Sequence, residues 1–209
     1  AQGADLRPVS AVATAAAGTA EASATLETGI YQYASASTGD ASVALPNDGS
    51  VNIQAIANAT APGYAEASAE MDYGIYQSAT GESSASVDFN NTGSVLIGAT
   101  ANAIGESAYA YASIDESGVA QYAFADLGSA SVSLTNGAVA GSGVDTAVTA
   151  PATLGVQAVA KATATEGDAT AYAYLSSSPI YQSAEGDTAA TVTLTNNGVL
   201  SILAQATAH

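Results

Sequence analysis

Apolar and polar residues alternate along almost the whole chain with a period of two. The clearest example is Val51-x-Ile53-x-Ala55-x-Ala57-x-Ala59, in which every second residue is small or aliphatic. Successive side chains of a β-strand point to opposite faces, so this period indicates strands with one face toward a core. No segment has the 3.6-residue apolar spacing of an amphipathic helix. The pattern therefore predicts an all-β protein.

The alternating segments recur about every 44 residues. One marker of the repeat is the glutamine of a Gly-Ile-Tyr-Gln motif and its variants: Gln32, Gln77, Gln121 and Gln182. A second marker is an asparagine that precedes a glycine turn: Asn47, Asn91, Asn136 and Asn196. A fixed period of this length is typical of solenoids and propellers. We divide the single repeat domain, 1–209, into a first repeat (1–50), a second (51–94), a third (95–137), an insertion (138–153), a fourth (154–198) and an unfinished fifth repeat strand (199–209).

Each repeat contains four short alternating segments, separated by residues that favour turns. Equivalent strands stack in parallel in a β-solenoid, whereas propeller blades and antiparallel sandwiches or meanders alternate strand direction. Identical residues at equivalent positions favour the solenoid, because stacking aligns the glutamines and the asparagines into amide ladders. We therefore predict a β-solenoid of about four coils of ~44 residues with four short strands each. An antiparallel β-sandwich or meander is the alternative.

The two terminal segments resemble the interior strands, and the C-terminal one begins a new repeat without a polar cap. Soluble solenoids need such caps, so we expect both segments to pair with other copies of the chain. Coil stacking and donation of a terminal strand are both open. In the opposing interpretation the last strand pairs within its own chain and Pro8 blunts the other edge. The predicted self-assembly residues are Val9, Ala11, Ala13, Leu200, Ile202, Ala204, Ala206 and Ala208.

The composition narrows the class of protein. Only 2 residues are basic against 19 acidic ones, for a formal net charge of −17. Nucleic acid is excluded as a partner because phosphate binding needs clustered Lys and Arg, and no apolar run is long enough for membrane insertion. The chain has no cysteine and is rich in Ala, Ser, Thr and Gly. These features favour a protein secreted to the cell surface or beyond after removal of a signal peptide.

The repeated Gln and Asn positions, the Ala, Ser and Gly content and the absence of cysteine resemble bacterial curli-like extracellular fibre subunits and holdfast-anchoring surface adhesins. The resemblance is one of pattern and covers the whole chain. It implies a structural subunit of a self-assembling extracellular fibre, in a biofilm matrix or a cell-surface filament, with other copies of itself as partners. The alternative function is a monomeric cell-surface adhesin, a binding solenoid.

Catalytic chemistry finds little support in the sequence. The only histidine is His209, the only lysine is Lys161, and the carboxylates are scattered over positions expected to face water. We therefore predict no enzyme, no catalytic residues and no cofactor. Calcium is the one metal to weigh, because carboxylates lie in turns at Gly39-Asp40, Gly81-Glu82, Glu166-Gly167-Asp168 and Glu185-Gly186-Asp187. Simple solubilising turns are the favoured interpretation of these residues.

Tyrosine is the most common aromatic residue, with 11 Tyr against 2 Phe and no Trp. Several tyrosines occupy outward positions of the predicted strands. This predicted surface aromatic set is Tyr31, Tyr76, Tyr181, Tyr109, Tyr111, Tyr172 and Tyr174. Rows of tyrosine could support contacts between fibres or binding of an extracellular polysaccharide, or they could pack across strands within the sheet.

Overall fold

The computed structural model describes residues 9–137 and 151–209, so most of the predicted insertion lies outside the described residues. The described part is all β, as predicted, and contains no helix. Its strands are β1 (Val9–Thr14), β2 (Ala20–Ala36), β3 (Asp40–Asn47), β4 (Ser50–Thr60), β5 (Tyr64–Gly81), β6 (Ser84–Asn91), β7 (Ser94–Gly105), β8 (Ser107–Ala125), β9 (Ser129–Asn136), β10 (Thr153–Ala164), β11 (Ala169–Leu175), β12 (Ile180–Gly186), β13 (Ala189–Asn196) and β14 (Val199–Ala208).

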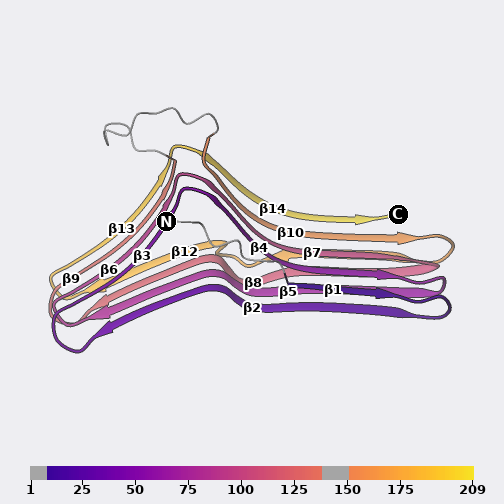
Figure 1. Cartoon of the computed structure of the whole chain (residues 1–209), viewed down its shortest axis with the longest axis horizontal. Helices are drawn as coiled ribbons and strands as arrows, with labels where there is room; N and C mark the ends of the chain where they lie inside the picture. Colours follow the sequence, from indigo (N-terminus) through magenta and orange to yellow (C-terminus); the bar gives the residue numbers. More distant parts are fainter. Residues whose placement is uncertain (1–8, 138–150) are drawn as a thin grey trace.

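The strands form three sheets, and every strand pairing is parallel (Figure 1). Sheet A has the order β1-β4-β7-β10-β14. Sheet B has the order β11-β8-β5-β2, with β12 also paired to β8, and sheet C has the order β13-β9-β6-β3. This parallel arrangement is consistent with a β-solenoid. It overturns the antiparallel sandwich or meander, in which neighbouring strands run in opposite directions.

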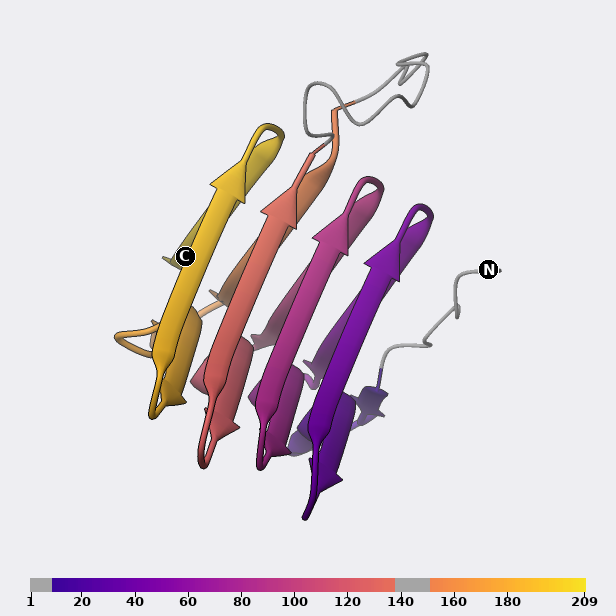
Figure 2. The ribbon, with the colours of Figure 1, turned by 90° about the vertical axis from the view of Figure 1, so that its left-hand side faces the viewer.

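Each strand pairs with its equivalent in the adjacent repeat (Figure 2). Along sheet B the register partners are Gln32, Gln77, Gln121 and Gln182. Along sheet C they are Asn47, Asn91, Asn136 and Asn196. The two residue sets predicted to form ladders are therefore aligned in the structure.

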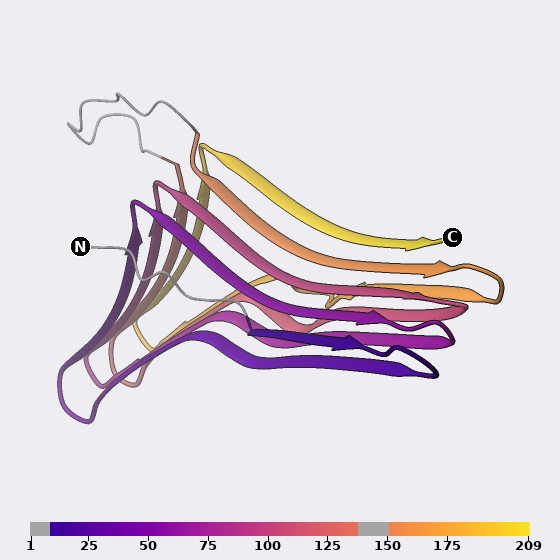
Figure 3. The same ribbon diagram turned by 45° about the vertical axis from the view of Figure 1, so that its right-hand side comes forward.

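The three sheets enclose a core that contains rows of alanines and a smaller number of large apolar side chains. Sheets A and B lie face to face along one half of the molecule, and sheet C rises from sheet B to meet sheet A in the other half (Figures 1 and 3). Between sheets A and B the core consists mainly of buried alanines in rows. The same core also contains larger, fully buried side chains from all three sheets, including Met71, Phe89, Ile97 and Leu134. Alanine methyl groups fill this interior only if the sheets lie close together, so packing there is sensitive to volume.

The prediction of four short strands per repeat is wrong for three of the four repeats. The second and third segments form one long strand in β2, β5 and β8, of 17, 18 and 19 residues. A β-bulge absorbs the bend, since the register between β5 and β8 shifts between Met71 and Tyr73. In the fourth repeat Pro179 precedes β12 and has no N–H to donate, and there β11 and β12 are separate strands.

The glycine of the Gly-Ile-Tyr-Gln motif in sheet B faces the side chain of an isoleucine in sheet A. A Cβ atom built on Gly74 would lie 2.3 Å from Ile97 Cγ2 and 2.6 Å from the carbonyl oxygen of Gly118. Gly29 has the same relation to Ile53, at 2.2 Å from its Cγ2. The motif thus combines a glycine that leaves room for an isoleucine of the facing sheet with a core isoleucine one residue later.

We predict that Gly74→Ala lowers the free energy of unfolding by about 1–3 kcal/mol, the usual cost of overpacking a core. The atoms in the way include a backbone carbonyl, which cannot rotate aside. Chemical denaturation followed by far-UV circular dichroism measures the effect. Gly49→Ala is the matched control, because a Cβ there meets no atom within 4 Å. Equal stabilities of the two variants would contradict this account of the motif.

Candidate functional site

The four glutamines of sheet B form a hydrogen-bonded ladder through the interior. The Nε2 of Gln182 donates to Gln121 Oε1 at 2.9 Å, that of Gln121 to Gln77 Oε1 at 2.9 Å, and that of Gln77 to Gln32 Oε1 at 2.8 Å. Each Nε2 also donates across to a carbonyl of sheet C, as Gln121 does to Ser133 O at 3.1 Å. The side chains of Gln77 and Gln121 are fully buried. The ladder therefore ties neighbouring strands of sheet B together and joins sheet B to sheet C.

The four asparagines form a second ladder at the corner between sheets C and A. The Nδ2 of Asn47 donates to Asn91 Oδ1 at 2.7 Å, that of Asn91 to Asn136 Oδ1 at 2.7 Å, and that of Asn136 to Asn196 Oδ1 at 2.8 Å. In the same residues Nδ2 also donates to the backbone carbonyl of the first residue of the next strand of sheet A, such as Thr153 O at 2.8 Å from Asn91. This ladder runs opposite to the glutamine ladder, since each earlier repeat donates to the later one.

Removing one rung of the glutamine ladder should destabilise the fold. A buried polar group that is left without a hydrogen-bond partner lowers the free energy of unfolding by about 1–3 kcal/mol. We predict that Gln121→Leu lowers the free energy of unfolding by about that amount or more. It leaves Gln77 Oε1 and Ser133 O without this donor and Gln182 Nε2 without this acceptor. The control is Gln157→Leu, which replaces a half-buried glutamine that forms no such rung. Urea denaturation of both variants measures the difference, and equal losses would count against the ladder.

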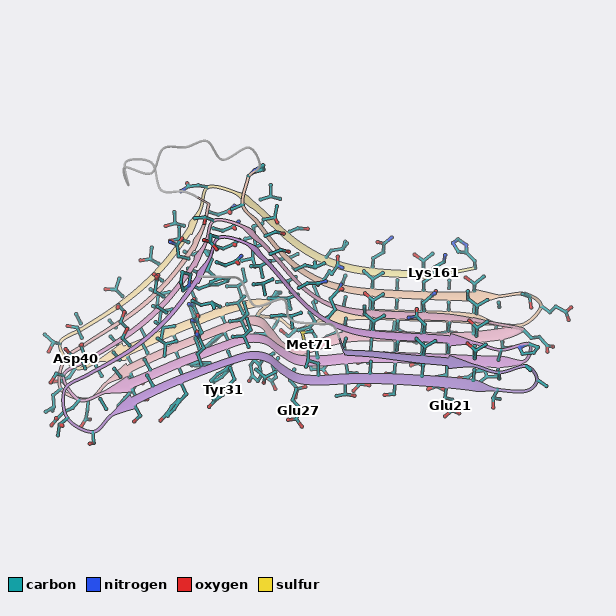
Figure 4. The ribbon with its side chains drawn as sticks, in the orientation of Figure 1. Glu21, Glu27, Tyr31, Asp40, Met71 and Lys161 are labelled. Atoms are coloured by element: carbon teal, nitrogen blue, oxygen red, sulfur yellow. The ribbon has the colours of Figure 1, made fainter. Side chains whose placement is uncertain are left out.

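A row of tyrosine rings crosses all four repeats on the outer face of sheet B. Ring centroids are 5.3 Å apart between Tyr31 and Tyr76, 5.4 Å between Tyr76 and Tyr122, and 5.3 Å between Tyr122 and Tyr181. Tyr31 points away from the core (Figure 4). Tyr31 and Tyr76 are nearly parallel, with 5° between their planes. Their faces therefore stack on each other, which is the geometry of cross-strand packing.

Tyr122 belongs to this row, although it was not among the predicted surface tyrosines. The third repeat has Ala120 at the tyrosine position of the motif, and Tyr122, two residues further on the same face, supplies the ring. Burial, and then the neighbouring Tyr73, Tyr76 and Tyr181, raise the pKa of Tyr122 to about 12. The compensating tyrosine could have been found by comparing same-face positions across the repeats. Among the other predicted surface tyrosines, the ring centroids of Tyr109 and Tyr172 lie 6.0 Å apart, and the two ring planes are tilted by 54°.

Carboxylates accumulate outside the bend of sheet B. Asp72 lies beside Met71 in sequence, and Figure 4 shows Met71 inside the molecule and Glu27 outside it. Burial raises the pKa of Asp72, and the charges of Asp115, Glu116, Glu27 and Glu70 raise it further. In-register stacking causes this crowding, because it brings the acidic residues of successive repeats together.

Because the pKa of Asp72 is raised in the folded protein, its contribution to stability falls as pH rises. Folded Asp72 binds its proton more tightly than the unfolded chain, whose carboxyl has the ordinary pKa of 3.8. Its contribution to stability is fully present below pH 3.8 and is lost as pH rises through the folded pKa. We predict that Asp72→Asn flattens the fall of Tm as pH rises above 3.8 and raises Tm at pH 7. Unchanged slopes in differential scanning calorimetry would contradict this.

The end of the stack at β13 and β14 leaves core positions open. Val192 is 49% exposed, although its register partner Val132 is 1% exposed, and Leu194 is 50% exposed against 0% for Leu134. The predicted self-assembly residue Ile202 is also 50% exposed, whereas its partner Val156 is buried. On β14, Leu200 is half-buried, while Ala204, Ala206 and Ala208 are exposed. At the opposite edge of sheet A, the segment that contains Val9, Ala11 and Ala13 forms β1.

The two basic side chains considered for chemistry lie on neighbouring segments of sheet A, since His209 N donates to the carbonyl oxygen of Ala162, the residue after Lys161, at 3.1 Å. His209 is exposed, and Lys161 is exposed on the outer side of sheet A (Figure 4). No cluster of three or more His, Asp or Glu suited to a metal ion is found over 9–137 and 151–209. Of the turn residues weighed for calcium, Asp40 accepts a hydrogen bond from Ser84 Oγ at 2.8 Å. In the described part of the chain, no helix has the length and apolar character needed to span a bilayer.

No protein-family model, curated protein or solved structure matches this chain. The geometry of the ladders and the sheet edges is therefore the basis for any functional conclusion.

Proposed function

We propose that the chain is a β-solenoid of about four coils that acts as the structural subunit of a self-assembling extracellular bacterial fibre. The observation that carries this proposal is the open end of the stack, where the apolar side chains of Val192, Leu194 and Ile202 are half-exposed although their equivalents one repeat earlier are buried. The outer strands β13 and β14 also leave one backbone edge unpaired within the described residues. Such edges template the pairing of another strand.

Further support comes from the kind of chemistry that the chain offers. Its ordered polar interactions inside the core are ladders that link coils, and these stabilise a stack rather than create a cleft. The tyrosine row and the alanine rows likewise follow the stacking direction. This pattern suits a structural role without catalysis. Secretion to the cell surface or a biofilm matrix remains part of the proposal, on the grounds of composition.

The net charge of −17 opposes association of copies, since like charges repel over the ~10 Å Debye length of 0.1 M salt. We predict short or no filaments at low ionic strength and neutral pH. Longer filaments should form as salt rises or as pH falls toward the pI of about 4.1. Negative-stain electron microscopy and light scattering test this prediction. Monodisperse particles at every salt concentration and pH, with or without calcium, would overturn the fibre proposal.

The alternative is a monomeric surface-binding solenoid, and the tyrosine row is the feature that favours it. Tyr31 and Tyr181 are 64% and 40% exposed. However, stacking of Tyr31 on Tyr76 occupies ring faces that a sugar would need, and leaves mainly ring edges and hydroxyls for a ligand. Sedimentation with insoluble polysaccharides, comparing the protein with Tyr31→Ser, distinguishes the two functions. Tyrosine-dependent binding by a protein that never forms filaments would favour the adhesin.

A further inference from the structure

We propose that copies stack head to tail in continuous register, with β14 of one copy taking the place of β1 in the next. The inference rests on the proposed self-assembly and specifies its interface. The open end is thus covered by a second copy of this chain, whose β2 pairs with β11 and β12 and whose β3 pairs with β13.

The first argument is the polarity of the two ladders. At the β13 end, Gln182 Oε1 receives no rung donor and Asn196 Nδ2 has no rung acceptor among the described residues. At the opposite end, Gln32 Nε2 donates only to Ala44 O at 3.4 Å, and Asn47 Oδ1 accepts only from Gly49 N at 3.3 Å. Each end therefore offers what the other lacks. Gln32 of the next copy can donate to Gln182, and Asn196 can donate to Asn47 of that copy.

The second argument is the side-chain pairing that this register creates on sheets B and C. Following the strand registers across the stack, Tyr31 of the next copy meets Tyr181, and Glu21 meets Thr170. Asp40 of the next copy likewise meets Ala189. Within one chain the same alignment places Glu21 directly beside Glu66. The junction thus extends the tyrosine row and avoids the like-charge pairing found inside the subunit.

The third argument concerns the number of strands in each sheet. We call each successive strand position along the stacking direction a level. Sheet A has five levels, occupied by β1, β4, β7, β10 and β14. Sheets B and C have four levels each, because β11 and β12 both pair with β8 and so occupy the same level. Placing β2 of the next copy directly after β11 and β12 therefore puts its β1 at the level of β14. One level of a sheet holds one strand at a given register. Either β1 or β14 must give way.

The extent of pairing decides between the two strands. β1 covers six residues of β4, from Ala55 to Thr60, and leaves Ser50–Gln54 without a described partner on that side. β14 pairs with ten residues of β10, and the same register carried to β4 spans Ser50–Ala59. It also sets Leu200 and Ile202 beside Val51 and Ile53. β14 therefore replaces β1 with more backbone pairing and more apolar contact.

Engineered disulfides test the exchange, and the natural chain has no cysteine to interfere. The residues Thr207, Lys161, Asn102, Asn58 and Val12 form one register column across sheet A. Strand replacement brings Thr207 of one copy beside Asn58 of the next, whereas simple end-on stacking brings Thr207 beside Val12. Within one copy these pairs are about 14 and 19 Å apart at ~4.8 Å per strand, too far for a disulfide.

We expect oxidised filaments of the double variant Thr207→Cys, Asn58→Cys to run as covalent multimers on a denaturing gel, and those of Thr207→Cys, Val12→Cys to stay largely monomeric. The reverse result, or no cross-link in either variant, overturns strand replacement and leaves fibre formation standing. A protein that forms no filaments overturns the proposed function itself. The two failures are therefore distinguishable.

The axial repeat of the filament gives a second and independent measurement. Continuous register advances four strands per subunit, or about 19 Å, while end-on stacking of β1 on β14 advances five, or about 24 Å. End-on stacking would also separate Gln182 and Gln32 by two levels and break the ladder. Helical reconstruction by cryo-electron microscopy should give the shorter repeat. A repeat near 24 Å would overturn the inference without mutagenesis.

Discussion

Parallel, in-register pairing of equivalent residues is the constraint on which the rest of the structure depends. Outside the bulge between β5 and β8, residues of an interior strand lie beside their counterparts from the repeat before and the repeat after. This arrangement is stabilised by side chains that can hydrogen-bond to, or stack on, an identical side chain. An amide has both a donor and an acceptor, so each ladder residue of the two interior repeats donates one rung and accepts another: Gln77, Gln121, Asn91 and Asn136. Tyrosine rings stack for the same geometric reason.

The same constraint imposes costs on other residues. A carboxylate lies beside another carboxylate at Glu21 and Glu66. At Asp72, burial and then the surrounding acidic residues raise the pKa. The chain carries few basic residues that could compensate. Stacking is therefore favoured by buried ladders and apolar rows and opposed by surface charge. Solution conditions that change the charge, such as salt and pH, act on this balance.

A narrow core built on alanine has a further consequence for the ends of the stack. Interior residues are covered by neighbours on both sides, whereas the residues of β13 and β14 are covered on one side only, and their apolar side chains are half-exposed. Because each rung is directional, the two ends differ in chemistry. An interface between such ends is heterologous, and a heterologous interface that does not close gives an open filament. In the proposed filament, the mismatch between five strands in sheet A and four strand positions in the other two sheets makes strand exchange part of the interface.

The local pattern of residues was enough to predict the β-strands, the repeat and the two ladder sets, because a period of two and the recurrence of Gln and Asn are properties of the chain itself. The bend that fuses two segments into β2, β5 and β8 was not predictable, since it depends on a bulge and on a glycine that faces a distant isoleucine. Tyr122 joined the tyrosine row only because Ala120 left space beside Tyr76 in the folded sheet. Ladder polarity and the unequal strand count of the sheets were likewise decided by tertiary structure. They depend on how side-chain amides orient between neighbouring repeats and on which strands occupy the same position in a sheet. Neither property is encoded in the spacing of residues along the chain.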